Sequence, residues 1–231
     1  MRIIVTSDWH GDATTAGVDR YEDVEFAATT VCEAAINLQA DVFIHLGDIS
    51  DPDPPRCWKA ASLPIRIAAA LKVAGIPSLW LTGNHDVLED GEGSHVLSPL
   101  KASGLGYVLD GPGVSSVVPG LRILALPFVA RTHNYDPMMV VKMSEGDRID
   151  LVISHLNIEG IEPGSETKEF SRGRDVFLPL AKISRAWPDA VILNGHYHRP
   201  QTWNGVHIPG SLVRLTRGER ENQPGYLMIE V

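Results

Sequence analysis

Short apolar runs alternate with helical patterns along the first third of the chain. Runs rich in aliphatic side chains cover residues 2–6, 41–46 and 77–82, and each run has the length of a buried strand. Between them, residues 22–39 and 65–74 place apolar side chains at the three- and four-residue spacing of an amphipathic helix. The order strand, helix, strand, helix, strand is typical of an α/β fold with a parallel sheet.

The pattern changes after about residue 106. Short apolar runs there stand between Gly and Pro residues, and we expect antiparallel strands at 107–109, 114–118 and 121–126. Further strands are expected at 150–154, 190–194 and 226–231. Residues 159–174 are polar and contain glycine, which is typical of a mobile surface loop. No repeat or linker divides the chain, so the sequence predicts a mixed α/β architecture in one domain.

Composition excludes several classes of protein. With 44% hydrophobic and 21% charged residues over 231 positions, the chain has the composition of a globular protein, not of a disordered or fibrous one. No apolar run approaches the roughly 20 residues that span a bilayer, and the N-terminal run is too short for a signal peptide. Two cysteines are too few for a disulfide framework. We therefore expect a cytoplasmic protein without a membrane partner.

The charge is unevenly distributed. The net charge of −9 disfavours a passive nucleic-acid coat protein. Residues 164–220, however, hold nine basic and five acidic side chains, a net of +4, whereas residues 1–163 have a net of −11. An acidic part beside a basic part suits a metal site next to an anion-binding surface, but charge also fluctuates along ordinary chains. Both interpretations stay open at this point.

Metal-ligand side chains follow five of the expected strands. Each group alone is ordinary turn chemistry, but together they stand where the carboxyl ends of parallel strands meet. Carboxylate, imidazole and amide ligands without a thiolate suit Mn, Fe or Zn. The groups are Asp8 with His10, Asp48, Asn84 with His85 and Asp86, His155, and His196 with His198.

Spacing supports this grouping. Residues two apart in an extended segment point to the same side, which applies to Asp8 with His10 and to His196 with His198. A glycine stands directly before Asp48, Asn84 and His196. A residue without a Cβ lets the backbone turn sharply at the sheet edge.

The order of these motifs resembles that of the calcineurin-like metallophosphoesterases. The resemblance implies a two-layer β-sandwich flanked by helices, with a two-metal site at its edge. The motifs that carry it are Asp8-Trp9-His10, Gly47-Asp48-Ile49-Ser50-Asp51, Gly83-Asn84-His85-Asp86, His155, and Gly195-His196-Tyr197-His198.

The resemblance also implies a role for each residue. One divalent ion is assigned to Asp8, His10, Asp48 and His198, and the other to Asp48, Asn84, His155 and His196, so that Asp48 bridges them. His85 is implied as the acid or phosphate-stabilising group, oriented by Asp86 or a neighbouring acid. Asp51 stands where some relatives have a second histidine, which places more of the catalysis on His85. Mn²⁺ is the first choice of metal, with Fe or Zn as alternatives.

The C-terminal part resembles the SbcD-type DNA repair nucleases in particular. The resemblance rests on residues 194–201, 208–219 and 224–231, with Leu126-Pro127-Phe128 fitting the same group. It implies a two-metal-dependent phosphodiester hydrolase that cleaves DNA in repair or recombination, as an exonuclease or endonuclease. It also implies a homodimer and an SbcC-type ATPase partner. Arg214, Arg217 and Arg172 would then contact DNA phosphates, or else be ordinary exposed side chains.

Such nucleases usually continue into a DNA-capping domain and an ATPase-binding segment. Here the last strand ends at Val231, so we expect a single catalytic domain over residues 1–231, either a minimal nuclease of viral or plasmid origin or a shortened form. A small-molecule phosphodiesterase or phosphatase acting on a nucleotide is the alternative, favoured by the net charge of −9. A non-catalytic scaffold is disfavoured, because every ligand type is present.

Overall fold

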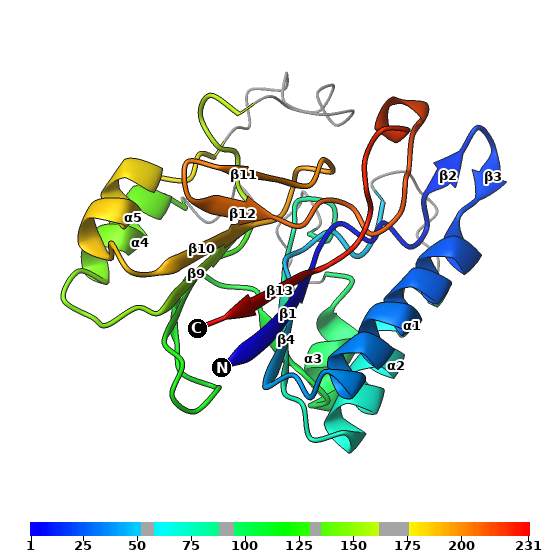
Figure 1. Ribbon diagram of the computed structural model, residues 1–231, viewed down its shortest axis with the longest axis horizontal. Coiled ribbons are helices and arrows are strands. Elements are labelled where there is room, and N and C mark those ends of the chain that lie inside the picture. The colour runs from blue at the N-terminus through cyan, green and yellow to red at the C-terminus, as the bar shows by residue number, and fades with distance from the viewer. Residues whose placement is uncertain (52–57, 88–94, 130–134, 162–175) are drawn as a thin grey trace.

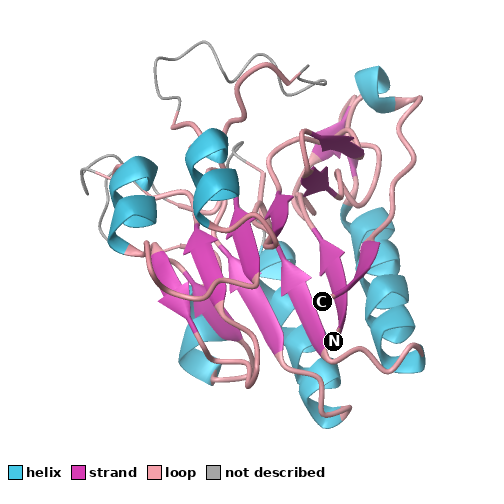
Figure 2. Cartoon of the chain, turned by 60° about the vertical axis from the view of Figure 1, so that its left-hand side comes forward, coloured by secondary structure: helices cyan, strands magenta, loops and turns pink. Residues whose placement is uncertain are grey.

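Two β-sheets face one another, and helices cover the outer face of each (Figure 1; Figure 2). The computed structural model describes residues 1–51, 58–87, 95–129, 135–161 and 176–231. The expected two-layer sandwich flanked by helices is confirmed. Within the described part of the chain, no helix has the length and hydropathy needed to cross a membrane.

The first sheet has five strands in the order β13-β1-β4-β5-β6. Its strands are β1 (Arg2–Thr6), β4 (Val42–His45), β5 (Ser78–Leu81), β6 (Tyr107–Leu109) and β13 (Leu227–Glu230). Only β13 runs antiparallel, against β1. The expectation that 107–109 is antiparallel was wrong, because the helix α3 (Ser98–Ser103) lies between β5 and β6 as a crossover that makes them parallel.

The second sheet has six strands in the order β11-β12-β10-β9-β8-β7. Its strands are β7 (Gly113–Ser115), β8 (Ile123–Leu126), β9 (Leu151–Ser154), β10 (Val191–Asn194), β11 (Gln201–Trp203) and β12 (Val206–Ile208). The hairpins β7–β8 and β11–β12 are antiparallel, whereas β8, β9, β10 and β12 are mutually parallel. The antiparallel expectation therefore holds for β7 with β8 and was wrong for the pairing of β8 with β9.

The long helices α1 (Tyr21–Asn37) and α2 (Trp58–Val73) cover the first sheet. α2 begins seven residues before the expected start and contains Pro64, which sequence reasoning placed outside the helix. Burial of Ala60, Leu63 and Pro64 on the core face offsets the cost of a proline inside a helix. Smaller elements complete the chain: the hairpin β2 (Thr14–Thr15) and β3 (Val18–Asp19), helices α4 (Pro137–Met143) and α5 (Leu180–Ala186), and the 3₁₀ turn η4 (Arg217–Glu219).

Three apolar layers hold these elements together. Ile3 and Val5 of β1 pack between the sheets with Ile153 of β9, while Ile4 faces the layer under α1 and α2. A third layer lies between the second sheet and the helices α4 and α5, and includes Val152. Central strands are thus buried on both faces, which explains why they read as continuous apolar runs.

Candidate metal centre

Six of the expected ligands meet where the two sheets present their carboxyl ends. Asp8, His10 and His198 form a first cluster, and Asp48, His155 and His196 form a second. Within each cluster, one ligand atom from each residue lies within 4.8 Å of the others. The residues follow β1, β4, β9 and β10, so both sheets contribute to the centre.

Backbone hydrogen bonds align the loop after β1 with the loop after β4. Asp8 N donates to Gly47 O at 3.0 Å, and His10 N donates to Asp48 O at 3.1 Å. The loops therefore continue the pairing of the two strands beyond the sheet, and they place the first cluster beside Asp48.

The backbone at these ligands is not extended. Asp8, His10 and His196 have φ values of 51°, 45° and 74°, in the left-handed region. The expectation of extended segments was therefore wrong, although Asp8 and His10 do share a cluster. His196 and His198 are divided between the two clusters, because the turn sends their side chains in different directions.

The glycines before the ligands leave space for neighbouring backbone. A Cβ on Gly83 would lie 2.1 Å from Asp48 Oδ1, and one on Gly195 would lie 2.6 Å from Leu46 O. At these two positions the absence of a side chain, more than a special φ, lets the strand ends come together. Gly47, with φ of 105°, has both constraints.

Asp48 belongs to the second cluster and also faces the first. Its Oδ2 atom is 3.1 Å from His155 Nε2 and 3.8 Å from His10 Nε2, so one carboxylate oxygen faces both. Asn84 Oδ1 lies 3.1 Å from His155 Nε2 and 3.0 Å from His196 Nδ1, which places it at the second cluster. The roles of bridging carboxylate and amide ligand that the resemblance implies for these two residues stay predictions.

Neighbouring oxygen atoms determine which imidazole nitrogen faces the second cluster. His155 Nδ1 lies 2.6 Å from Leu46 O and donates its hydrogen there, which turns Nε2 toward Asp48. In His196 the two nitrogens exchange roles. Nε2 donates to Asn157 Oδ1 at 3.1 Å, and Nδ1 faces the cluster. A hydrogen bond at the outer nitrogen fixes the tautomer that a metal needs.

Sequence reasoning missed two such partners, Asn157 and Glu219. Asn157 stands two residues after His155, a spacing that could have drawn attention to it. Glu219 Oε1 lies 3.0 Å from His198 Nδ1, and this glutamate belongs to the Gly-Glu pair that formed part of the resemblance without a role.

The first cluster has the polar atoms that a cation requires. Among the described residues, Asp8 Oδ2 is buried without a hydrogen-bond partner. His10 Nε2 and His198 Nε2 face each other at 3.1 Å. A cation between them would accept a lone pair from each nitrogen. Oxygen and nitrogen donors without sulfur fit a divalent ion such as Mn²⁺, Fe²⁺ or Zn²⁺.

Burial and neighbouring charged groups set the charge of these residues. Burial lowers the pKa of His196 to about 3 and, together with His198, holds the pKa of His10 well below its usual value. Both rings are therefore neutral near pH 7 and have a lone pair for a metal. Burial would raise the pKa of Asp48, but His155 and His85 hold it well below the usual range, so this residue is anionic.

Three residues expected to act in catalysis lie around the clusters. His85 Nε2 is 3.8 Å from Asp48 Oδ2, and its side chain is 9% exposed. The Asp86 carboxylate accepts hydrogen bonds from the backbone N–H groups of Asp48, Ile49, Ser50 and Gly83. Of the acids offered to orient His85, the structure thus places Asp48 beside it, whereas Asp86 fastens the loop after β4. Asp51 Oδ2 lies 3.9 Å from His10 Nδ1.

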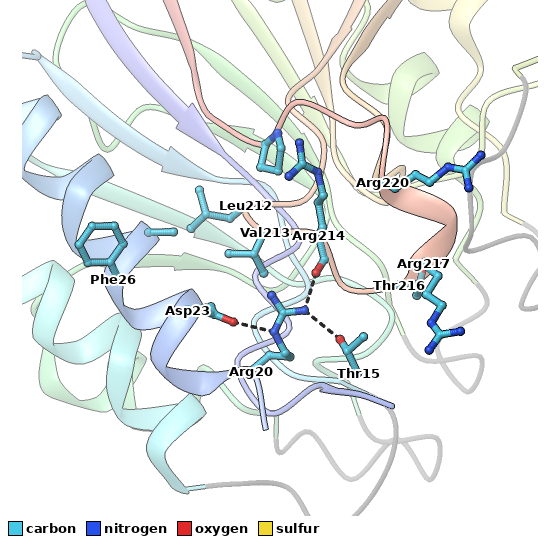
Figure 3. A pocket seen from close by; sticks show the side chains of 12 residues that line it. Thr15, Arg20, Asp23, Phe26, Leu212, Val213, Arg214, Thr216, Arg217 and Arg220 are labelled. Carbon is cyan, nitrogen blue, oxygen red and sulfur yellow. Dashed lines mark hydrogen bonds and ion pairs between the residues drawn. The ribbon is translucent and has the colours of Figure 1, made fainter. Parts of the chain in front are cut away.

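Two of the three arginines expected to contact substrate lie in the C-terminal segment. Arg214 and Arg217 are exposed and line an open groove together with Arg20 and Arg220 (Figure 3). Arg172 lies outside the described residues, as does most of the loop expected at 159–174.

The chain is similar in sequence to known proteins over its whole length. A sequence model described as calcineurin-like phosphoesterase matches residues 1–200. The chain is 22% identical over 250 residues to the SbcD subunit of the SbcCD nuclease of Staphylococcus epidermidis. That alignment covers 100% of this chain and 66% of the relative, so the chain spans just under two thirds of the relative's length.

Solved structures show the same fold. A protein of Thermus thermophilus aligns with a TM-score of 0.56 and 12% identity, over 91% of this chain and 89% of that one. A dimetal phosphatase from Danio rerio aligns with a TM-score of 0.54 and 12% identity, over 90% and 86% of the two chains. At this identity the likeness concerns the fold alone.

Proposed function

The chain belongs to the calcineurin-like phosphoesterase family and is a metal-dependent phosphoester hydrolase, and on this premise we propose that it is a nuclease of SbcD type whose substrate is DNA. The observation that carries the proposal is the pair of clusters connected by Asp48, which belongs to the second cluster and lies 3.8 Å from His10 of the first. The similarity to the staphylococcal SbcD subunit supports the choice of substrate.

The metal ligands proposed are those that the clusters bring together. Asp8, His10, His198 and Asp48 would hold one ion, and Asp48, His155, His196 and Asn84 would hold the other. When bound, two divalent ions neutralise charge on a phosphodiester and lower the pKa of a water molecule between them. We propose Mn²⁺, with Fe and Zn as the alternatives.

His85 is proposed as the catalytic acid. It belongs to neither cluster, yet its Nε2 atom lies beside Asp48 Oδ2 at the edge of the centre. A proton on this imidazole is positioned to pass to the oxygen that leaves phosphorus. Asp51, beside His10, and Asp86, which fastens the loop after β4, would hold the surrounding groups in place.

The groove with Arg214 and Arg217 is proposed as part of the path of the DNA backbone. The segment that carries these arginines is attached to the centre at two points. Leu212 N donates to Asp8 O at 3.4 Å, and Glu219 contacts His198. Exposed guanidinium groups on a segment that contacts the metal centre suit a phosphate chain longer than one nucleotide. By the same similarity, we propose an SbcC-type ATPase partner, a homodimer and a cytoplasmic location.

The test compares substrates. Labelled single-stranded DNA, double-stranded DNA and bis-p-nitrophenyl phosphate are incubated with the protein in Mn²⁺ and in excess chelator. We expect DNA degradation that requires Mn²⁺. Hydrolysis of the small diester with DNA left intact would overturn the nuclease proposal and favour a nucleotide phosphodiesterase, which the net charge of −9 would suit.

Two variants separate catalysis from metal binding. His85→Ala should retain both ions but lose about 10²- to 10⁴-fold in turnover, because it removes a proton donor and leaves the clusters intact. Asp48→Ala should lose ions and activity together. His207→Ala, in β12 and in neither cluster, is the matched control. Loss of metal from His85→Ala, or two bound ions in Asp48→Ala, would contradict these assignments.

A further inference from the structure

Glu219 is a buried acid in an otherwise exposed turn. Its neighbours Arg217, Gly218 and Arg220 are exposed, whereas Glu219 is 1% exposed. A carboxylate removed from water requires hydrogen bonds or a charge to compensate it. Its contacts therefore indicate what the turn is built to hold.

The two carboxylate oxygens of Glu219 have different partners. Oε2 accepts a hydrogen bond from Leu215 N at 2.7 Å, which closes the turn on itself. Oε1 lies 3.0 Å from His198 Nδ1 and 3.3 Å from Thr216 Oγ1. An ionised carboxylate only accepts hydrogen bonds, so an ionised Glu219 would hold the proton of the His198 ring at Nδ1.

That placement leaves the lone pair of His198 at Nε2. This is the nitrogen that faces His10 Nε2 at 3.1 Å, inside the first cluster. Glu219 thus selects the tautomer in which His198 is able to bind a cation there.

The acceptors that the structure describes at the outer nitrogens of the second cluster are of another kind. His155 donates to the carbonyl of Leu46, and His196 donates to the amide oxygen of Asn157. Both of these acceptors are neutral. An anionic acceptor makes an imidazole a stronger metal ligand than a neutral one does, so the two clusters differ in donor strength.

We propose that Glu219 is a positioning residue of the first cluster, which orients His198 with Nε2 toward the ion, strengthens that ion's binding, and ties the turn bearing Arg217 to the metal centre. The inference rests on the proposed two-ion centre and deepens it. The same carboxylate holds His198 and Leu215, so occupancy of the first cluster and the conformation of the arginine-bearing turn are linked.

The isosteric variant Glu219→Gln distinguishes this role from simple packing. A side-chain amide has one oxygen and one NH₂ group, so it can accept from His198 Nδ1 or from Leu215 N but not from both. Either orientation makes two donors face each other. Glu221→Gln makes the same charge change two residues away at an exposed side chain paired with Arg220, and it is the matched control.

The first measurement is the tautomer of His198 in metal-free protein, by ¹H–¹⁵N spectra of histidine-labelled samples with the signal assigned by His198→Gln. We expect the Nδ1–H form in the wild type and in Glu221→Gln, with a mixture of tautomers in Glu219→Gln. A merely structural Glu219 would leave the tautomer unchanged between these proteins. The Nε2–H form in the wild type would overturn the proposal, and this result does not depend on the folding of Glu219→Gln.

The second measurement is Mn²⁺ binding, by titration with detection of free Mn²⁺ by electron paramagnetic resonance. Glu219→Gln should lower the binding affinity of one of the two ions by about 10- to 100-fold and leave that of the other unchanged. Asn157→Ala, at the second cluster, should lower the binding affinity of the other ion. Equal weakening of both ions by Glu219→Gln, or of neither, would overturn the proposal. A wild type that binds no Mn²⁺ would instead sink the proposed function, while the tautomer still decides the role of Glu219.

Discussion

At the scale of single residues, Gly83 shows how the centre depends on a missing side chain. Its Cα lies so close to the loop after β4 that a Cβ would be 2.1 Å from Asp48 Oδ1 and 2.5 Å from Asp48 N. Asp48 has little room to move, because its backbone N–H is held by Asp86 and its Oδ1 accepts from His85 N at 2.9 Å. The glycine is therefore part of the metal centre, although it offers no ligand.

We expect Gly83→Ala to displace Asp48. The variant should weaken Mn²⁺ binding and lower the free energy of unfolding by about 1–3 kcal/mol, the usual cost of overpacking. Metal titration and urea unfolding check this. Gly111→Ala, where a Cβ would meet nothing within 4 Å, is the control. Unchanged Mn²⁺ binding in Gly83→Ala would show that the loop adapts.

The identities of the clustered ligands could be predicted from the sequence, since acids, imidazoles and an amide followed the apolar strands. Their grouping could not be predicted from spacing. Asp8 and His10 adopt left-handed backbone conformations, and His196 and His198 point into different clusters. The supporting contacts from Asn157 and Glu219 were also missed, because each depends on a neighbour that only folding brings near.

At the scale of elements, one side-chain cluster connects α3 to β6. Asp110, directly after β6, accepts from His95 Nε2 at 3.1 Å and pairs with Lys101 of α3. The hydrogen bond from His95, reinforced by Lys101, holds the pKa of Asp110 well below its usual value of 3.8. The ionised carboxylate is thus favoured in the folded state.

We expect the stabilisation from Asp110 to depend on pH. A pKa that is lower in the folded state contributes stability above about pH 4, and this stability is lost as pH falls toward the folded value. Asp110→Asn should therefore lower the free energy of unfolding by about 1 kcal/mol at pH 6 and by less at pH 3.5. Urea unfolding at both values measures the difference, and an equal effect at the two would contradict the assignment.

Some elements were predictable and others were not. The strands of the first sheet and the helix α1 agree closely with their apolar patterns. The helices α4 and α5 have seven residues each, too few for a helical period to stand out. The start of α2 was missed because Pro64 reads as a boundary, whereas burial of one helix face overrides that signal.

At the scale of the whole molecule, the centre joins the two sheets. Cluster residues that follow β1 and β4 belong to the first sheet, and those that follow β9 and β10 belong to the second. His155 Nδ1 donates to Leu46 O across this junction. Ions bound by both sheets would therefore stabilise the sandwich as a unit.

We expect Mn²⁺ to raise the melting temperature. An ion present at 100 times its dissociation constant stabilises the folded state by about 2.7 kcal/mol, which is on the order of 5–10 °C for a chain of this size. Scanning calorimetry with Mn²⁺ and with excess chelator measures the shift. Asp48→Ala should remove most of it. Equal melting temperatures in the two solutions would contradict a metal centre between the sheets.

The sequence by itself determined the α/β class, the main strands, the residue types of the metal centre and the family resemblance, because these follow from local periodicity and from motifs of a few residues. The resemblance also gave the assignment of ligands to two ions, which spacing alone did not. Tertiary structure decided which acid lies beside His85 and where Glu219 makes its contacts. The physical reason is that these relations depend on side-chain direction across turns and on close approach between strand ends. The packing of the two sheets sets both the side-chain directions and the close approach. The residues that meet there, such as Leu46 with His155 and Asn84 with His196, lie more than a hundred positions apart in the sequence.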